Sequence, residues 1–192
     1  MNKDYWEHRY AEGNTGWDVG YAATPIQQYI DQLTNKHLKI LIPGAGNGHE
    51  AAYLFSKGFE HVYVLDIAKQ PLTHLAQQVP YFPKSQLLHQ DFFELEDEFD
   101  LIIEHTFFCA LLPEWREKYV SKMFNLLKPK GKLVGLLFDF PLTEQGPPFG
   151  GNKELYEELF SSKFDIQLLD TAHNSIKPRA QRELFVKMYP KK

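Results

Sequence analysis

The stretch from His37 to Asp66 constrains the fold more than any other part of the chain. It holds two strand-like apolar runs, at 38–43 and 62–65, separated by a glycine-rich turn and an apolar-faced segment. The turn reads Gly44-Ala-Gly-Asn-Gly-His, and glycine takes the dihedrals of a sharp corner and lets a ligand approach the main chain. A strand, glycine turn, helix, strand and final acid, Asp66, predict the nucleotide-binding half of a doubly wound parallel sheet.

The spacing of the glycines indicates which nucleotide binds. A dinucleotide fingerprint has glycines at its first, third and sixth positions, which here are 44, 46 and 49. Position 49 is His49, and the third glycine of the turn is Gly48. This difference argues against NAD and favours S-adenosylmethionine, which has no pyrophosphate for the helix terminus to hold. A tight turn without a ligand is the alternative interpretation.

Length and composition predict one globular domain over residues 1–192, because 43% of the residues are hydrophobic. The net charge is −4 and basic runs are short, so we expect no nucleic-acid partner. No stretch is apolar enough for a signal peptide or a membrane span, which predicts a cytoplasmic protein with no membrane partner. Cys109 is the only cysteine and the histidines are scattered, so we expect no disulfide and no metal site. We further expect a monomer or a weak dimer.

The first 22 residues are dense in aromatic side chains and are interpreted as a lid. Trp6 and Tyr10 have helical spacing, and Trp17 follows in a glycine-rich segment. Aromatic faces attract cations by about 0.5–2 kcal/mol, so these rings would suit the positive sulfonium of S-adenosylmethionine. The alternative is a cluster that only covers the sheet.

Two further strand ends carry candidate ligand residues. Asp91 and Phe92 follow a short strand predicted at 85–89, where the acid and ring would contact an adenine. The apolar strand predicted at 99–104 is followed by His105, at the strand end where a methyl acceptor would meet the cofactor. Further strands at 133–140, 164–168 and 184–188 complete a seven-stranded α/β sheet with helices on both faces. The last strand is expected to be antiparallel, because the segment linking it to its neighbour has no helical pattern.

Several motifs together resemble the thiopurine S-methyltransferase family, particularly its halide and thiol methyltransferase branch. They are Trp6-Glu-His-Arg-Tyr with Trp17-Asp, Pro43-Gly-Ala-Gly-Asn-Gly-His, Asp66, Asp91-Phe-Phe, Phe107-Phe-Cys-Ala with Pro113-Glu-Trp-Arg, and Gly146-Pro-Pro-Phe. The resemblance covers nearly the whole chain and implies a seven-stranded, Rossmann-like (class I) methyltransferase that uses S-adenosylmethionine. Tyr10 and His105 stand where the halide branch tends to have tryptophan and tyrosine, which leaves the acceptor open.

The resemblance also implies roles for individual residues. The residues expected to bind the cofactor are Trp6, Tyr10, Trp17, Gly44, Gly46, Asp66, Asp91, Phe92 and His105. Arg116, Phe108 and Phe149 would bind the substrate, and Arg116 and His105 are the catalytic candidates. Arg116 would favour an anionic acceptor, unless it only pairs with Glu114 or Glu117 on an exposed face.

The predicted reaction moves a methyl group from S-adenosylmethionine to a thiol, thiopurine, bisulfide or halide, giving S-adenosylhomocysteine. Methyl transfer from a sulfonium is an in-line displacement, and an anionic acceptor needs no general base. His105 could take a proton from a thiol or could be only a wall of the site. Two alternative functions remain at this point, a non-catalytic S-adenosylmethionine-binding protein and an NAD(P)-dependent oxidoreductase.

Overall fold

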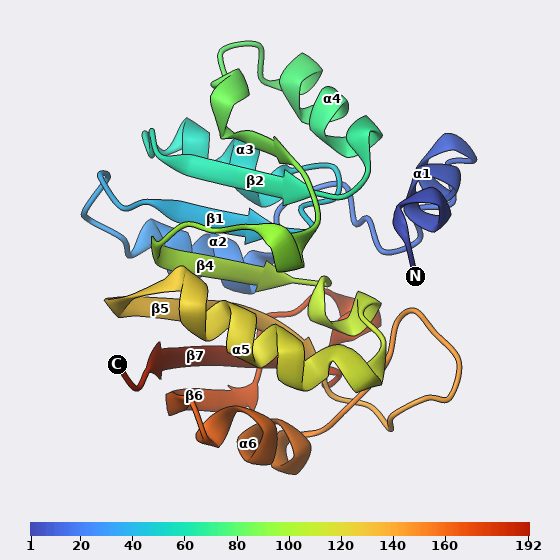
Figure 1. Cartoon of the computed structure of the whole chain (residues 1–192), viewed down its shortest axis with the longest axis vertical. Helices are drawn as coiled ribbons and strands as arrows, with labels where there is room; N and C mark the ends of the chain where they lie inside the picture. Colours follow the sequence, from blue (N-terminus) through green and yellow to red (C-terminus); the bar gives the residue numbers. More distant parts are fainter. The chain divides into compact units, whose positions relative to one another are not determined.

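The computed structural model in Figure 1 describes all 192 residues. They form two compact units, Met1–Leu95 and Glu96–Lys192. The seven strands follow the order β3-β2-β1-β4-β5-β7-β6. This order, with β7 antiparallel to both of its neighbours, confirms the predicted fold class.

The first unit alternates strands and helices, as the parallel pairing of its strands requires. Its elements are α1 (Lys3–Ala11), α2 (Thr24–Asp31), β1 (Ile40–Pro43), α3 (His49–Ser56), β2 (Val62–Asp66), α4 (Lys69–Gln78) and β3 (Leu87–His89). Strand β2 pairs in parallel with β1 and with β3. All four residues of β1 are buried, which explains why the run shows no polar alternation.

The second unit consists of β4 (Phe99–His105), α5 (Arg116–Leu126), β5 (Leu127–Phe138), α6 (Lys153–Ser161), β6 (Phe164–Thr171) and β7 (Glu183–Pro190). Strands β4 and β5 are parallel, whereas β7 runs antiparallel between β5 and β6 (Figure 1). Short 3-10 helices η1 to η5 lie at Lys84–Gln86, Phe92–Glu94, Phe108–Ala110, Pro113–Trp115 and Lys177–Arg179. The core of this unit is rich in aromatic rings, including Tyr119, Tyr156 and Phe160.

Several strand boundaries differ from the predicted ones, most of all the start of β5. Strand β5 starts at Leu127 rather than 133, because Leu127 already pairs with Phe99, and the strand contains Pro129 and Gly131. Pro129 and Gly131 interrupt a helical pattern but tolerate an extended backbone. The strand predicted at 85–89 is shortened to β3 by the 3-10 turn η1.

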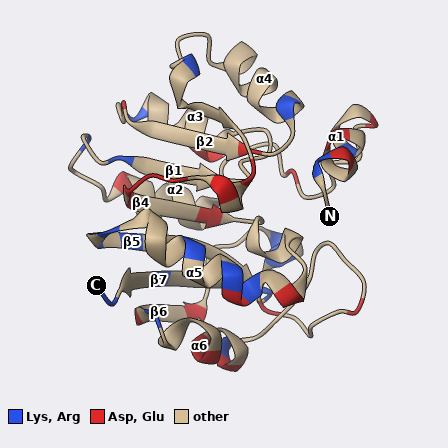
Figure 2. Cartoon of the chain, in the orientation of Figure 1, with Lys and Arg blue, Asp and Glu red and all other residues tan.

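Charged residues of both signs occur together in helices α1 and α5. Figure 2 shows Lys or Arg together with Asp or Glu in α1 and in α5, so neither helix presents a uniformly basic face. None of the helices combines the length and the apolar content needed to cross a membrane.

Gly135 in β5 provides a test of the packing between β4 and β5. A Cβ at this position would lie 2.1 Å from the carbonyl oxygen of Glu104 and 2.6 Å from its Cβ. We expect Gly135→Ala to lower the free energy of unfolding by about 1–3 kcal/mol, because backbone must move to relieve the overlap. Urea unfolding measures the change. Gly16→Ala, where a Cβ meets nothing within 4 Å, is the control, and equal losses in both variants would contradict the packing described here.

Candidate active site

The glycine turn between β1 and α3 has a backbone that requires glycine. Gly44, Gly46 and Gly48 all have positive φ angles, of 58°, 52° and 75°. The amide of Gly44 donates to the carbonyl oxygen of Leu65 at 2.7 Å, which ties the turn to the end of β2. A Cβ on Gly48 would lie 2.9 Å from the side chain of Leu75 in α4. The turn is therefore fixed by the strand and the helix beside it.

Asp66 ends β2 next to this turn, as predicted, and it is only 6% exposed. Its Oδ1 atom accepts a hydrogen bond from the Ala68 amide at 2.9 Å, and the amides of Gly46 and Ile67 also donate to the carboxylate. Burial raises the pKa of Asp66 to about 7, with a further contribution from the negative charge of Glu7. No basic side chain pairs with this carboxylate.

The aromatic rings of the N-terminal segment gather over the glycine turn. The Trp17 ring makes edge contacts with Trp6 and with Tyr10, each with a centroid distance of 5.6 Å. A Cβ on Gly46 would lie 3.6 Å from Trp17 Nε1 and 3.7 Å from the Tyr10 hydroxyl. The structure thus brings Trp6, Tyr10 and Trp17 together with Gly46.

One cation beside these rings was missed by the sequence analysis. The Arg9 guanidinium carbon lies 5.2 Å from the Trp17 ring centroid, and Arg9 Nε donates to the Asn14 carbonyl oxygen at 2.9 Å. Helical spacing from Trp6 and Tyr10 gave no sign of this contact, because Trp17 lies outside helix α1.

Asp91 and Phe92 lie just beyond β3, at the edge where β2 also ends. His89, the last residue of β3, is in register with Asp66. Asp91 Oδ1 accepts a hydrogen bond from the Phe93 amide at 2.8 Å and caps the short helix η2, while Phe92 is buried. Asp91 therefore has a local structural role as a helix cap, and its contact with the adenine stays a prediction.

These features fit S-adenosylmethionine. A buried carboxylate without a basic partner can accept the hydroxyl hydrogens of a ribose, and aromatic faces can receive a sulfonium. The residues that would hold the cofactor in the first unit are Gly44, Gly46 and Asp66, with the three rings and the Asp91–Phe92 pair beside them. The side chains form no group of three His, Cys, Asp or Glu residues arranged to hold a metal ion.

In the second unit, the end of β4 is organised by a carboxylate that the sequence analysis missed. Glu104 is 1% exposed, and its Oε1 accepts hydrogen bonds from the amides of Phe107 and Phe108, both at 2.8 Å. Its Oε2 accepts from the Tyr119 hydroxyl at 2.6 Å. Burial raises the pKa of Glu104, while these donors lower it. An acidic residue ending an otherwise apolar strand was the available signal.

Arg116 is buried rather than exposed, so the predicted alternative of a surface ion pair with Glu114 or Glu117 is wrong. The side chain is 5% exposed, and Nη2 donates to the Gly150 carbonyl oxygen at 2.6 Å. Its Nε and Nη1 atoms have no hydrogen-bond partner. The guanidinium carbon lies 4.7 Å from the Phe108 ring centroid. Burial lowers the pKa of Arg116 below its usual value.

His105 lies beside an arginine that the sequence analysis did not single out. Its Nε2 is 2.9 Å from Arg179 Nη1, which also donates to Glu183 Oε1 at 3.3 Å. A guanidinium can only donate, so Nε2 accepts in this arrangement and the ring proton is assigned to Nδ1. The contact with Arg179 places His105 in a fixed position at the end of β4, and its role as a base stays a prediction.

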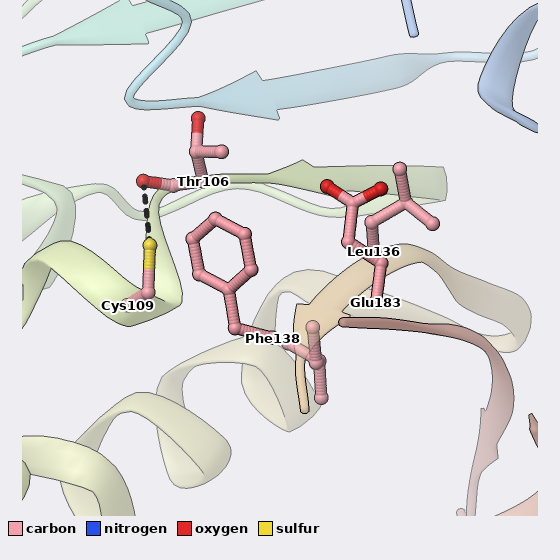
Figure 3. A pocket seen from close by; sticks show the side chains of 6 residues that line it. Thr106, Cys109, Leu136, Phe138 and Glu183 are labelled. Carbon is pink, nitrogen blue, oxygen red and sulfur yellow. Dashed lines mark hydrogen bonds between the residues drawn. The ribbon is translucent and has the colours of Figure 1, made fainter. Parts of the chain in front are cut away.

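Phe108, Phe149 and Cys109 are packed together around the turn that follows β4. The Phe149 amide donates to the Cys109 carbonyl oxygen at 2.7 Å, and both phenylalanines are buried. Figure 3 shows the Cys109 thiol directed at the Thr106 carbonyl oxygen, 3.4 Å away. Burial, followed by the charge of Glu104, raises the pKa of Cys109, so the thiol remains neutral. The small pocket in Figure 3 is lined by Thr106, Cys109, Leu136, Leu137, Phe138 and Glu183.

The strand order and the glycine turn define a class I, S-adenosylmethionine-dependent methyltransferase, and comparisons with known proteins agree. The fold matches the crystal structure of a Burkholderia thailandensis N1-methyltransferase with bound S-adenosylhomocysteine, with a TM-score of 0.80 and 19% identity over 99% of this chain and 87% of that one. A probable thiol methyltransferase of Arabidopsis thaliana is 32% identical over 80% of this chain and 70% of its own. A thiopurine S-methyltransferase of Acinetobacter baylyi is 24% identical over 88% of each chain.

Residues 1–190 match the thiopurine S-methyltransferase family model. The chain belongs to this family, and it is an enzyme that uses S-adenosylmethionine as methyl donor. This confirms the family predicted from the motifs and removes the NAD(P)-dependent alternative. The roles of individual site residues stay predictions.

The raised pKa of Asp66 predicts that cofactor affinity depends on pH. Hydroxyl donors favour the ionised carboxylate, so affinity should rise about tenfold between pH 6 and 8, as the pKa near 7 is crossed. Isothermal titration calorimetry with S-adenosylmethionine measures this. Asp66→Asn should bind more weakly and lose that pH dependence, whereas Asp31→Asn, which removes an exposed carboxylate paired with Lys57, should keep it.

The same pKa makes an independent prediction for the free protein. The pKa of Asp66 in the folded protein is above its ordinary value of 3.8. The contribution of Asp66 to the free energy of unfolding is therefore fully present below pH 3.8 and is lost as the pH rises through 7. A flat affinity profile together with an unchanged pH-stability curve in Asp66→Asn would refute the role given to Asp66.

Proposed function

We propose that this methyltransferase acts on a small anionic acceptor, namely a thiolate, a thiopurine, bisulfide or a halide. Membership of the thiopurine S-methyltransferase family and similarity to a thiol methyltransferase support a sulfur acceptor. The observation that carries the anionic character of the acceptor is the buried, incompletely bonded guanidinium of Arg116.

A buried cation without an anionic partner is costly, since desolvation removes its hydration and nothing replaces it. Arg116 has one hydrogen bond, to a neutral carbonyl oxygen, and two buried N–H groups without partners. The nearby Cys109 thiol is neutral and cannot balance its charge. An anion that accepted a hydrogen bond from Nε or Nη1 would balance the charge of Arg116 and supply a missing acceptor. Charge-assisted hydrogen bonds of this kind are among the strong ones in proteins.

The contribution of the enzyme would then be alignment and a dry environment rather than proton transfer. S-adenosylmethionine supplies an electrophilic methyl group on a sulfonium. Arg116 would hold the acceptor and favour its anionic form, and the buried rings of Phe108 and Phe149 would exclude water. His105 would serve as a fixed wall of the site, because Arg179 occupies its Nε2 atom. His105 would also contact the cofactor.

On the cofactor side, Asp66 would accept from the ribose, and Asp91 with Phe92 would contact the adenine. Gly44 and Gly46 would lie against the amino-acid part, with Trp6, Tyr10 and Trp17 covering the sulfonium.

An acceptor screen tests the proposed function directly. The enzyme is incubated with S-adenosylmethionine and, separately, iodide, bisulfide, a small thiol or a thiopurine, and methylated products are measured by mass spectrometry. Product from at least one of these acceptors is expected. Tight cofactor binding with no product from any of them would contradict the proposed class of acceptor.

Arg116→Met should lower kcat/KM for the anionic acceptor about 10- to 100-fold, the range expected when a charge-assisted hydrogen bond of about 1.5–3 kcal/mol is lost. Steady-state kinetics at saturating cofactor measure the effect, and Arg116→Lys should retain part of the activity because it keeps the charge. Arg182→Met removes an exposed arginine and serves as the control. Unchanged turnover in Arg116→Met would exclude the role proposed here.

Trp6→Ala distinguishes cation recognition from simple contact area. If the rings recognise the sulfonium, this change should weaken S-adenosylmethionine several-fold more than uncharged S-adenosylhomocysteine. Calorimetry with both ligands measures the difference, and Trp115→Ala in the second unit is the matched control. Equal losses for the two ligands would mean that the rings provide only area.

A further inference from the structure

The side chain that breaks the dinucleotide fingerprint has a specific partner in the N-terminal segment. His49 Nε2 lies 2.8 Å from Asp18 Oδ1, and the two residues are 31 positions apart in the sequence. Asn47 Nδ2 donates to the other carboxylate oxygen of Asp18. Asn47 and His49 flank Gly48, so Asp18 contacts the residues on both sides of the last glycine of the turn. We call these three residues the clasp.

The side chains of the clasp are partly shielded from water and are hydrogen-bonded to nearby main chain. The side chains of His49 and Asp18 are 17% and 18% exposed. The Gly20 amide donates to Asp18 Oδ1 at 2.7 Å, and the Asp18 amide donates to the Thr15 carbonyl oxygen at 2.9 Å. Although burial opposes ionisation, the donors from Gly20, Asn47 and His49 lower the pKa of Asp18, so the carboxylate is charged at neutral pH.

A second attachment holds the other end of the segment. Glu7 Oε1 accepts from the Lys69 amide at 2.9 Å, at the first turn of α4, a helix whose own N-cap side chain makes no capping hydrogen bond. Gln70 Nε2 donates to the Tyr10 carbonyl oxygen at 3.2 Å. Helix α1 is therefore fixed to α4, and the clasp fixes the chain after it.

Trp17 lies between these attachments and directly precedes Asp18. Its indole faces Gly46, and it contacts both Trp6 and Tyr10. Movement of Asp18 would therefore shift the ring that joins the aromatic cluster to the glycine turn.

We propose that Asp18 and His49 are positioning residues that set the affinity for S-adenosylmethionine by holding Trp17 over the glycine turn. This inference rests on the cofactor-side role proposed above for Trp17. Neither residue needs to touch the reacting atoms, so the effect belongs to cofactor binding rather than to turnover.

His49→Phe, which keeps a ring and removes the nitrogen, is the principal test. We expect it to weaken S-adenosylmethionine binding about tenfold in calorimetry, to leave kcat at saturating cofactor within about twofold, and to speed amide hydrogen exchange in peptide 12–23 of the free enzyme. His49→Gln, whose amide can still donate to Asp18, should recover most of the affinity. Asp18→Ala tests the same contact without altering helix α3.

Controls separate the clasp from general effects. His8→Phe removes a histidine–carboxylate pair of the same kind, His8 with Glu12, whose side chains are 71% and 54% exposed, and it should change none of these quantities. If the pair acts as one unit, the double variant Asp18→Ala with His49→Phe should be no weaker than either single variant.

Two results would overturn the proposal. Unchanged exchange in peptide 12–23 in both His49→Phe and Asp18→Ala would mean that the clasp does not hold the segment. Faster exchange with unchanged affinity would mean that the segment does not serve the cofactor. Trp17→Ala separates this inference from the proposed function, because an unchanged affinity in that variant refutes the role of the ring itself, whatever the clasp does.

Discussion

Main-chain hydrogen bonds to the Asp66 carboxylate hold together the part of the first unit that is proposed to bind the cofactor. The carboxylate receives main-chain amides from the two residues that follow β2 and from Gly46, so one side chain fixes the strand end and the glycine turn together. Helix α1 adds a negative charge at Glu7 and the Tyr10 hydroxyl, whose pKa is raised by burial and then by Asp66. A buried acid surrounded in this way keeps its proton until about pH 7. Hydroxyl donors from a sugar would favour the ionised form of this carboxyl group.

The second unit uses a buried carboxylate for a different purpose. Glu104 takes two amides and a phenol from its own chain, and these donors shape the turn that leads from β4 to η3. Thr106 in this turn has a φ of 60°, which a β-branched residue adopts only under strain. The hydrogen bonds to Glu104 offset that strain and hold His105 and Phe108 in place. Asp66 is thus suited to a ligand, whereas Glu104 serves the scaffold.

The sequence was sufficient for those features that depend on local patterns. Apolar runs, the glycine turn and Asp66 predicted the first unit closely, because parallel strands and tight turns leave strong local signals. The start of β5 was misplaced, since a proline ends a helical pattern without preventing a strand. The clasp between Asp18 and His49 joins residues 31 positions apart, and the contact between His105 and Arg179 joins residues 74 positions apart. The burial of Arg116 depends on how the chain packs around helix α5. No local pattern in the sequence encodes such contacts, although Asp18 belongs to the Trp17-Asp motif.

Arg116 and Arg179 in the second unit differ in how their charges are balanced. Arg179 has a carboxylate partner in Glu183, which is itself 3% exposed, so the charge of this pair is balanced within the chain. Drawing Arg179 toward a ligand would leave Glu183 buried and uncompensated, at a cost of several kcal/mol. Arg116 has no such partner, and its single hydrogen bond to Gly150 leaves two N–H groups without acceptors. Binding of an anion is more favourable at Arg116, because it supplies acceptors for unpartnered N–H groups, whereas binding at Arg179 would leave Glu183 without its partner. The sequence presents both residues simply as arginines, and only their burial and partners give them different roles.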